Sequence, residues 1–82
     1  MDRDESVRFA TKYLEDLLSF FGINVAVDST IDDEVIQLSI PSTSINSLLI
    51  GKNADNLRAL QFIVSQSLAA RSAEVTRVNV DV

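Results

Sequence analysis

"LLIGKNADNLRAL", residues 48–60, interrupts an aliphatic run with a glycine and several polar residues before a helical pattern begins. The chain has two glycines in 82 residues, and one of them is Gly51 in this stretch. A glycine between two helical segments lets backbone amides approach an anion without a side chain in the way. The start of the next helix adds partial positive charge there, and Lys52 adds a full charge. The stretch therefore predicts a helix–loop–helix junction that faces a phosphate.

The residues before this stretch predict one helix and two strands. Apolar residues recur at steps of three and four over 5–21, which predicts a helix, and Gly22 fits its C-terminal cap. Alternating apolar residues over 23–28 and 35–40 predict two strands, and the polar sequence 28–34, "DSTIDDE", predicts the hairpin loop between them. Pro41 ends the second strand because it has no amide hydrogen for a ladder.

Two helices and a third strand are predicted for the rest of the chain. A short helix begins at one of the hydroxyl residues 42–44 and runs to about 49, and Gly51 breaks it. A longer helix begins at 53 or 55 and runs to about 70. Its main apolar stripe is Leu57, Leu60, Val64 and Leu68, and a weaker stripe is Ala59, Phe62, Ile63, Ala69 and Ala70. Alternation over 75–82 predicts a strand with Val78, Val80 and Val82 on one face.

This order of elements, helix–strand–strand–helix–helix–strand, constrains the topology. The first two strands form an antiparallel hairpin, and the long helical connection between the second and third strands suits a parallel crossover. We therefore expect an α+β fold, a three-stranded mixed sheet with its helices on one face. We also expect residues 1–82 to be a single domain and, because the last strand pattern runs to the final residue, part of a longer protein.

Charge and composition restrict the function. Residues 1–41 have a balance of −6 and residues 42–82 a balance of +1, so the net charge of −5 belongs to the first half. In physiological salt the Debye length is about 8 Å, so distant acids are largely screened from a site in the second half. The absence of cysteine and histidine removes disulfides, thiolates and the commonest general base, and we expect a protein that is not an enzyme.

Location and metal binding are restricted in the same way. No apolar run approaches the roughly 20 residues that span a membrane, and the acidic N-terminus does not resemble a signal peptide, so we expect a cytoplasmic protein. The acidic residues Asp28, Asp32, Asp33 and Glu34 lack the alternating ligands and central glycine of a calcium loop. We therefore expect a solvated hairpin there, with no metal or cofactor.

The residues around Gly51 resemble a known signature. Two aliphatics, then Gly51-Lys52-Asn53-Ala54, then aliphatics at 57 and 60, are similar to the KH-domain pattern with its GxxG loop. More narrowly, "GKNADNLRALQFIV" (51–64) and "TRVNVDV" (76–82) resemble the KH domain of the bacterial Jag proteins, also called sporulation stage III J-associated proteins. The likeness runs from roughly residue 7 to residue 82, and the element order αββααβ resembles the type II KH arrangement.

This resemblance implies a single-stranded RNA-binding module, KH-to-KH dimerisation and a following R3H domain. In KH domains the GxxG loop clamps four nucleotides of backbone, and here an aliphatic groove beside it would hold bases. The candidate RNA-binding residues are Ile45, Leu49, Ile50, Gly51, Lys52, Asn53, Ala54, Asp55, Leu57 and Arg58. Ala54 replaces the second loop glycine, and Asp55 places a carboxylate near the phosphate path, so we expect weak binding with modest salt dependence.

An alternative interpretation stays open. The chain would then be a KH-fold dimerisation or protein-interaction domain with weak or lost RNA binding. Phe62 and Ile63, on the weaker stripe of the long helix, would form the seam of a homodimer or bind a second KH protein. Packing of these two residues against the first helix explains the stripe equally well.

Overall fold

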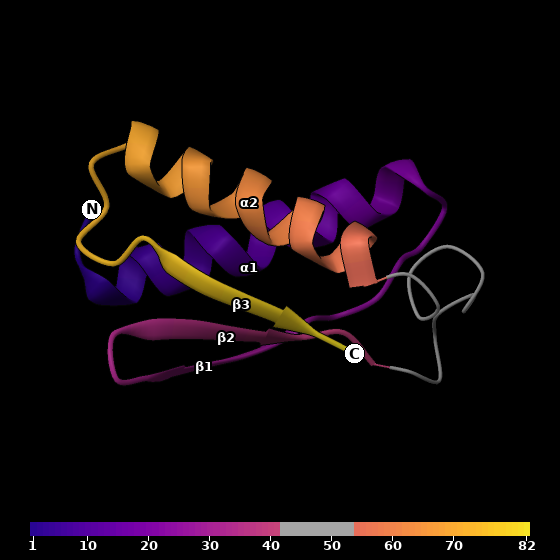
Figure 1. Cartoon of the computed structure of the whole chain (residues 1–82), viewed down its shortest axis with the longest axis horizontal. Helices are drawn as coiled ribbons and strands as arrows, with labels where there is room; N and C mark the ends of the chain where they lie inside the picture. The colour runs from indigo at the N-terminus through magenta and orange to yellow at the C-terminus, as the bar shows by residue number, and fades with distance from the viewer. Residues whose placement is uncertain (42–53) are drawn as a thin grey trace.

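Two helices pack side by side on one face of a three-stranded sheet (Figure 1). The computed structural model describes residues 1–41 and 54–82. In chain order, the elements are α1 (Arg3–Phe20), β1 (Asp28–Asp32), β2 (Val35–Ser39), α2 (Ala54–Ala70) and β3 (Arg77–Asp81). The strand order is β1-β2-β3, with β1 antiparallel and β3 parallel to β2. The predicted α+β class and mixed sheet are confirmed, and the predicted helix over 42–49 lies outside the described residues.

Helix α1 begins at a capping box. The backbone N–H of Glu5 donates to the Asp2 carboxylate at 2.8 Å, and the N–H of Asp2 donates to the Glu5 carboxylate at 3.2 Å. The first of these bonds stabilises the charged carboxylate and lowers the pKa of Asp2 below its usual value of 3.8. The helix therefore starts two residues earlier than the predicted start at residue 5.

Both helices end in the same hydrogen-bonded motif. After α1, Gly22 has a φ of +78°, its N–H donates to Ser19, and the next N–H donates to Leu18, each at 3.0 Å. After α2, Ser72 has a φ of +55°, and equivalent bonds of 3.1 and 3.0 Å run to Ala69 and Leu68. This is the Schellman motif, in which the residue after the cap adopts the left-handed conformation. The predicted Gly22 cap is confirmed, whereas nothing in the sequence indicated that Ser72 would adopt the same conformation.

The first strand lies later in the chain than predicted. Strand β1 is Asp28–Asp32, inside the segment predicted as the hairpin loop, and the turn is only Asp33 and Glu34. Both turn residues have positive φ, +52° and +64°, as in the type I′ turns that suit a two-residue hairpin. Glycine or asparagine usually marks such a turn, and their absence here explains why the prediction was wrong.

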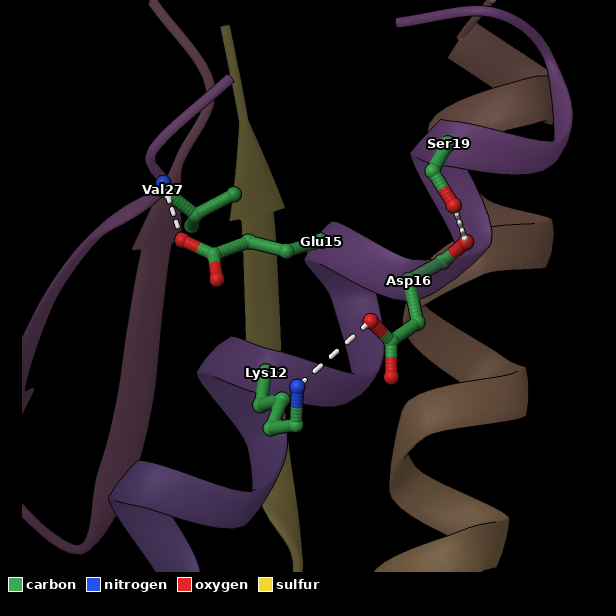
Figure 2. A network of polar contacts seen from close by, with 5 residues as sticks. All are labelled: Lys12, Glu15, Asp16, Ser19 and Val27. Carbon is green, nitrogen blue, oxygen red and sulfur yellow. Dashed lines mark hydrogen bonds and ion pairs between the residues drawn. The ribbon is translucent and has the colours of Figure 1, made fainter. Parts of the chain in front are cut away.

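Residues 23–27 are not part of the sheet, although they alternate like a strand. Ile23 and Val27 are buried, so the alternation still reports which side chains face the core. The N–H of Val27 donates to the Glu15 carboxylate at 2.8 Å, which ties this segment to α1 (Figure 2). The segment is therefore an extended connection anchored by a side chain.

The core lies between the helices and the sheet. Its members come from α1, α2, β2, β3 and the connections between them: Ala10, Leu14, Leu18, Ile23, Val27, Ile36, Leu38, Ile40, Leu60, Val64, Leu68, Val75, Val78 and Val80. The predicted main stripe of α2 is confirmed at three of its positions, and Leu57 is half-buried against this cluster. The prediction for Val82 is wrong, since it follows the end of β3 and is 38% exposed.

Helix α2 is joined to β3 by side chains as well as by packing. The N–H of Val80 donates to the side-chain oxygen of Gln61 at 3.0 Å. The hydroxyl of Ser65 donates to the carbonyl of Thr76 at 2.7 Å. Because Gln61 and Ser65 lie four residues apart on α2, they share one face of the helix. These bonds fix how α2 sits over β3 and thus where the start of α2 points.

Candidate nucleic-acid interface

The structure describes only the C-terminal part of the predicted RNA-binding set. Ile45, Leu49, Ile50, Gly51, Lys52 and Asn53 lie outside the described residues. Ala54 and Asp55 are the first two residues of α2. A helical residue has negative φ, so alanine at position 54 needs no glycine-like conformation. Asp55 belongs to the first turn of this helix.

Leu57 and Arg58 take different roles although they are neighbours in the chain. Leu57 is half-buried and packs against the core, while Arg58 is exposed. Leu57 therefore contributes mainly to the fold, and Arg58 is the predicted site residue whose charge lies at the surface. It lies one helical turn after Ala54, on the same side of α2 as Gln61 and Ser65.

Arg58 lines a hollow between α2 and the adjoining strands, which we name the Arg58 hollow. Its volume is about 440 Å³. The lining residues are Val35, Arg58, Gln61, Phe62, Ser65, Arg77 and Val78. Among the described residues that line the hollow, the two arginines are the charged ones, although the chain as a whole is acidic. The hollow is therefore a locally positive surface on an acidic protein.

Arg77 and Phe62 belong to this hollow but were not predicted as site residues. The sequence did contain a signal for Arg77, because it lies on the outward side of the alternating pattern of β3. Phe62 was assigned to the weaker stripe of α2, and its side chain is 63% exposed. Sequence spacing alone could not predict that Phe62 and Arg77 line one hollow, since they are fifteen positions apart and meet only through the packing of α2 on β3.

The chemistry of the Arg58 hollow suits an anionic, partly aromatic ligand. Guanidinium groups donate planar, paired hydrogen bonds that match phosphate oxygens. An exposed phenylalanine ring offers a surface on which a nucleobase can stack. The side-chain oxygen of Gln61 accepts from the Val80 N–H, so the amide NH2 of Gln61 is the group that can donate to a ligand.

The described residues contain no group of metal-ligating side chains and no helix that could cross a membrane. Within 1–41 and 54–82, no three histidine, cysteine, aspartate or glutamate side chains come together as a metal site requires. In the acidic hairpin, the Glu34 carboxylate lies 3.9 Å from Arg3 in an exposed ion pair. Neither α1 nor α2 combines the length and apolar character that a membrane-crossing helix needs.

Comparisons of the chain with models of protein families, with characterised proteins and with solved structures found no match. The function must therefore be argued from the residues of this chain.

Proposed function

We propose that this chain is a single-stranded RNA-binding module of the KH type, without enzymatic activity. The observation that carries the proposal is the position of Gly51-Lys52-Asn53-Ala54 in the chain, at the start of α2. These residues lead directly into the N-terminus of α2, in the crossover between two parallel strands of the sheet. This is the place where a glycine loop and a helix dipole can act together on a phosphate.

The proposed RNA path begins at this loop and continues along α2. Lys52 and the start of α2 hold one phosphate, and Arg58 lies one turn further on. Arg77, across the Arg58 hollow, provides the next cation, and Phe62 provides a ring for a base. Three phosphate contacts on a single strand give a slope of log affinity against log salt of about −2, a modest salt dependence.

An NMR titration with a short single-stranded RNA tests the proposal. We expect chemical-shift changes at residues 50–58 and at Arg77, and we expect K52D/N53D to abolish them. The charge-matched control is R3D/T30D, which changes the net charge by the same amount at exposed positions on α1 and β1. The control should bind RNA like the wild type. If millimolar RNA moves none of these resonances, the proposal fails.

Asp55 offers a test in the opposite direction. Asp55 is the second residue of α2, directly after the proposed phosphate-binding loop in the chain. D55N removes one negative charge there and should tighten RNA binding a few-fold. A charge of the same sign a few ångströms from a phosphate costs about 1 kcal/mol in water. No change in affinity would place the phosphates away from the start of α2.

One observation favours a second candidate function, self-association through α2. Its exposed residues Ala59, Phe62, Ile63, Gln66, Ala69 and Ala70 form what we name the outer face of α2. Phe62 is 63% and Ile63 is 39% exposed, and neither belongs to the core or to the residues packed against it, which disfavours packing against α1 as the explanation of this stripe. Residues 59–70 contain no charged side chain, so two copies could meet here without like-charge repulsion despite the net charge of −5.

The mass in solution tests this candidate. We expect the wild-type chain to form dimers at high concentration and F62Q/I63Q to be monomeric with an unchanged fold. The matched control is F20Q, which removes a phenylalanine that is 84% exposed at the end of α1. A wild-type chain that is monomeric at every concentration, or an F20Q variant that dissociates equally, would exclude the outer face of α2 as the seam.

A further inference from the structure

A second positive hollow lies at the other end of α2. It is formed by side chains of α1 and by Arg71, the residue that directly follows α2. Its volume is about 460 Å³, and we name it the Arg71 hollow. It is lined by Arg8, Phe9, Lys12, Tyr13, Asp16 and Arg71. A helix of 17 residues is about 25 Å long, so Arg71 is well separated from the start of α2.

The charge of the Arg71 hollow opposes that of the chain. Three cations and one carboxylate give its lining a balance of +2, whereas the whole chain carries −5. The Lys12 ammonium points to the Asp16 carboxylate, 3.8 Å away, so these two partly neutralise each other (Figure 2). Among the described residues, no carboxylate lies within ion-pair distance of Arg8 or Arg71. The net positive charge that a ligand would meet therefore comes from these two arginines.

The aromatic residues of this hollow hold one of the arginines in place. Phe9 and Tyr13 lie one turn apart on α1, with ring centroids 5.4 Å apart and planes tilted by 43°. The Arg71 guanidinium carbon lies 4.8 Å from the centroid of Phe9, a cation–π contact between α1 and the end of α2. This contact restricts the Arg71 side chain before any ligand arrives, which lowers the entropy lost on binding.

We propose that the Arg71 hollow binds a nucleotide. Arg8 and Arg71 hold its phosphate, and its base stacks on Tyr13 and on the Arg71 guanidinium, which are the two kinds of planar group that proteins use for bases. A ligand with charge alone, such as an acidic peptide, would use the arginines and leave the ring pair without a role. The proposal does not depend on the Gly51–Ala54 segment, because it involves only α1 and the residue that follows α2.

Tyr13 supplies a local probe for this site. It is the only tyrosine, and the chain has no tryptophan, so ultraviolet emission of the protein comes mainly from this ring. Titration with adenosine monophosphate at low salt should quench this emission, after correction for absorption by the base. It should also shift the amide resonances of 8–13 and of Arg71. Ribose 5-phosphate, which lacks the base, and adenosine, which lacks the phosphate, should each bind at least about tenfold more weakly.

Two variants with the same net charge distinguish binding at this hollow from non-specific electrostatic attraction. R8Q/R71Q should weaken binding of the mononucleotide by at least about tenfold, since it removes both phosphate donors. R3Q/T30D lowers the net charge by the same two units at exposed positions outside both hollows and should change the affinity by less than about twofold. R8K/R71K keeps the charge and should recover part of the affinity, and D16N should tighten binding by releasing Lys12. All four variants change exposed side chains, and circular dichroism checks that they fold.

Titration with a short RNA shows whether the site binds a nucleotide within an RNA strand or a free mononucleotide. If RNA quenches Tyr13 emission at lower concentration than the mononucleotide does, and R8Q/R71Q abolishes the quenching, the site binds one nucleotide of an RNA strand. Stronger binding of the free mononucleotide makes the site one for a soluble ligand. The proposal is overturned if millimolar mononucleotide leaves Tyr13 and the nearby amides unchanged. It is equally overturned if R8Q/R71Q binds like R3Q/T30D, or if phosphate alone or a glutamate-rich peptide binds as tightly as the nucleotide.

Discussion

Helices α1 and α2 are alike on the side that faces the sheet and different on the side that faces away from it. Each buries leucines at regular spacing, and each ends in the same motif. The exposed residues of α1 are mostly charged: Arg3, Asp4, Glu5, Arg8, Lys12 and Asp16. The exposed residues of α2 from 59 onward are alanine, phenylalanine, isoleucine and glutamine. The inner faces satisfy the requirements of the fold, and the outer faces differ in charge: α1 presents mainly charged side chains to solvent and α2, from residue 59 onward, presents uncharged ones.

The largest effect is expected from the inner faces. Leu14 and Leu68 are fully buried in the same core. Truncation to alanine leaves a cavity and typically costs about 2–5 kcal/mol, a large part of the stability of a domain of this size. We expect L14A and L68A to lower the free energy of unfolding by similar amounts in urea titrations. A cost below about 1 kcal/mol for either one would show that the two inner faces are not equivalent.

A smaller effect is expected from the two helix ends, which adopt the same conformation with different residue types. Gly22 and Ser72 both have positive φ, which is unfavourable for residues that carry a Cβ. A Cβ at Gly22 would meet no atom within 4 Å, so G22A should cost about 1 kcal/mol through backbone conformation alone. S72G should stabilise the chain by up to about 1 kcal/mol.

Thermal unfolding of the two single variants and of the double variant measures both effects. The double variant should unfold close to the wild type, because the two sites are distant and their effects add. If S72G destabilises the chain, the entropy that glycine adds to the unfolded state outweighs the relief at the end of α2.

The smallest effect concerns the capping box that starts α1. Since the pKa of Asp2 is lowered in the folded chain, its carboxylate stabilises the fold above its ordinary pKa of 3.8. That contribution is lost as the pH falls through the lower, folded-state value. D2A should therefore melt a few degrees below the wild type at neutral pH, and the difference should disappear in strong acid.

The control for this prediction is D4A. It removes a carboxylate from the same first turn but leaves the capping box intact. We expect D4A to have a weaker effect at neutral pH. A D2A variant whose melting temperature differs from the wild type equally at all pH values would contradict the role of the charged carboxylate.

The sequence predicts those elements of the fold whose local residue pattern agrees with their tertiary packing. The stripes of α1 and α2, strands β2 and β3 and the Gly22 cap follow local patterns, and the structure confirms them. The position of β1 could not be predicted, because the register of a hairpin depends on its turn. Here Asp33 and Glu34 form a turn that contains neither glycine nor asparagine. The strand predicted over 23–27 is wrong: the alternation reflects the burial of Ile23 and Val27, and the Val27 N–H donates to Glu15 on α1.

The candidate site residues also divide into those that local sequence indicates and those that only tertiary contacts reveal. Lys52 and Arg58 were identified from their place next to Gly51, a feature of the sequence alone. Arg77 and Arg71 were not, because each becomes part of a hollow only through contacts between segments distant in the chain. Neither the hydrogen bonds from α2 to β3 nor the contact of Arg71 with Phe9 has a sequence signature.

The hydrogen bonds from Gln61 and Ser65 to β3 also affect how the sheet can grow. Strand β3 is at one edge of the sheet, and these side chains already occupy the Val80 N–H and the Thr76 carbonyl. A foreign strand cannot extend the sheet on that side without breaking them. On the opposite edge, β1 begins and ends with aspartate, so stacked copies would bring like charges together. Both edges of the sheet therefore resist the strand-by-strand addition that leads to fibrils.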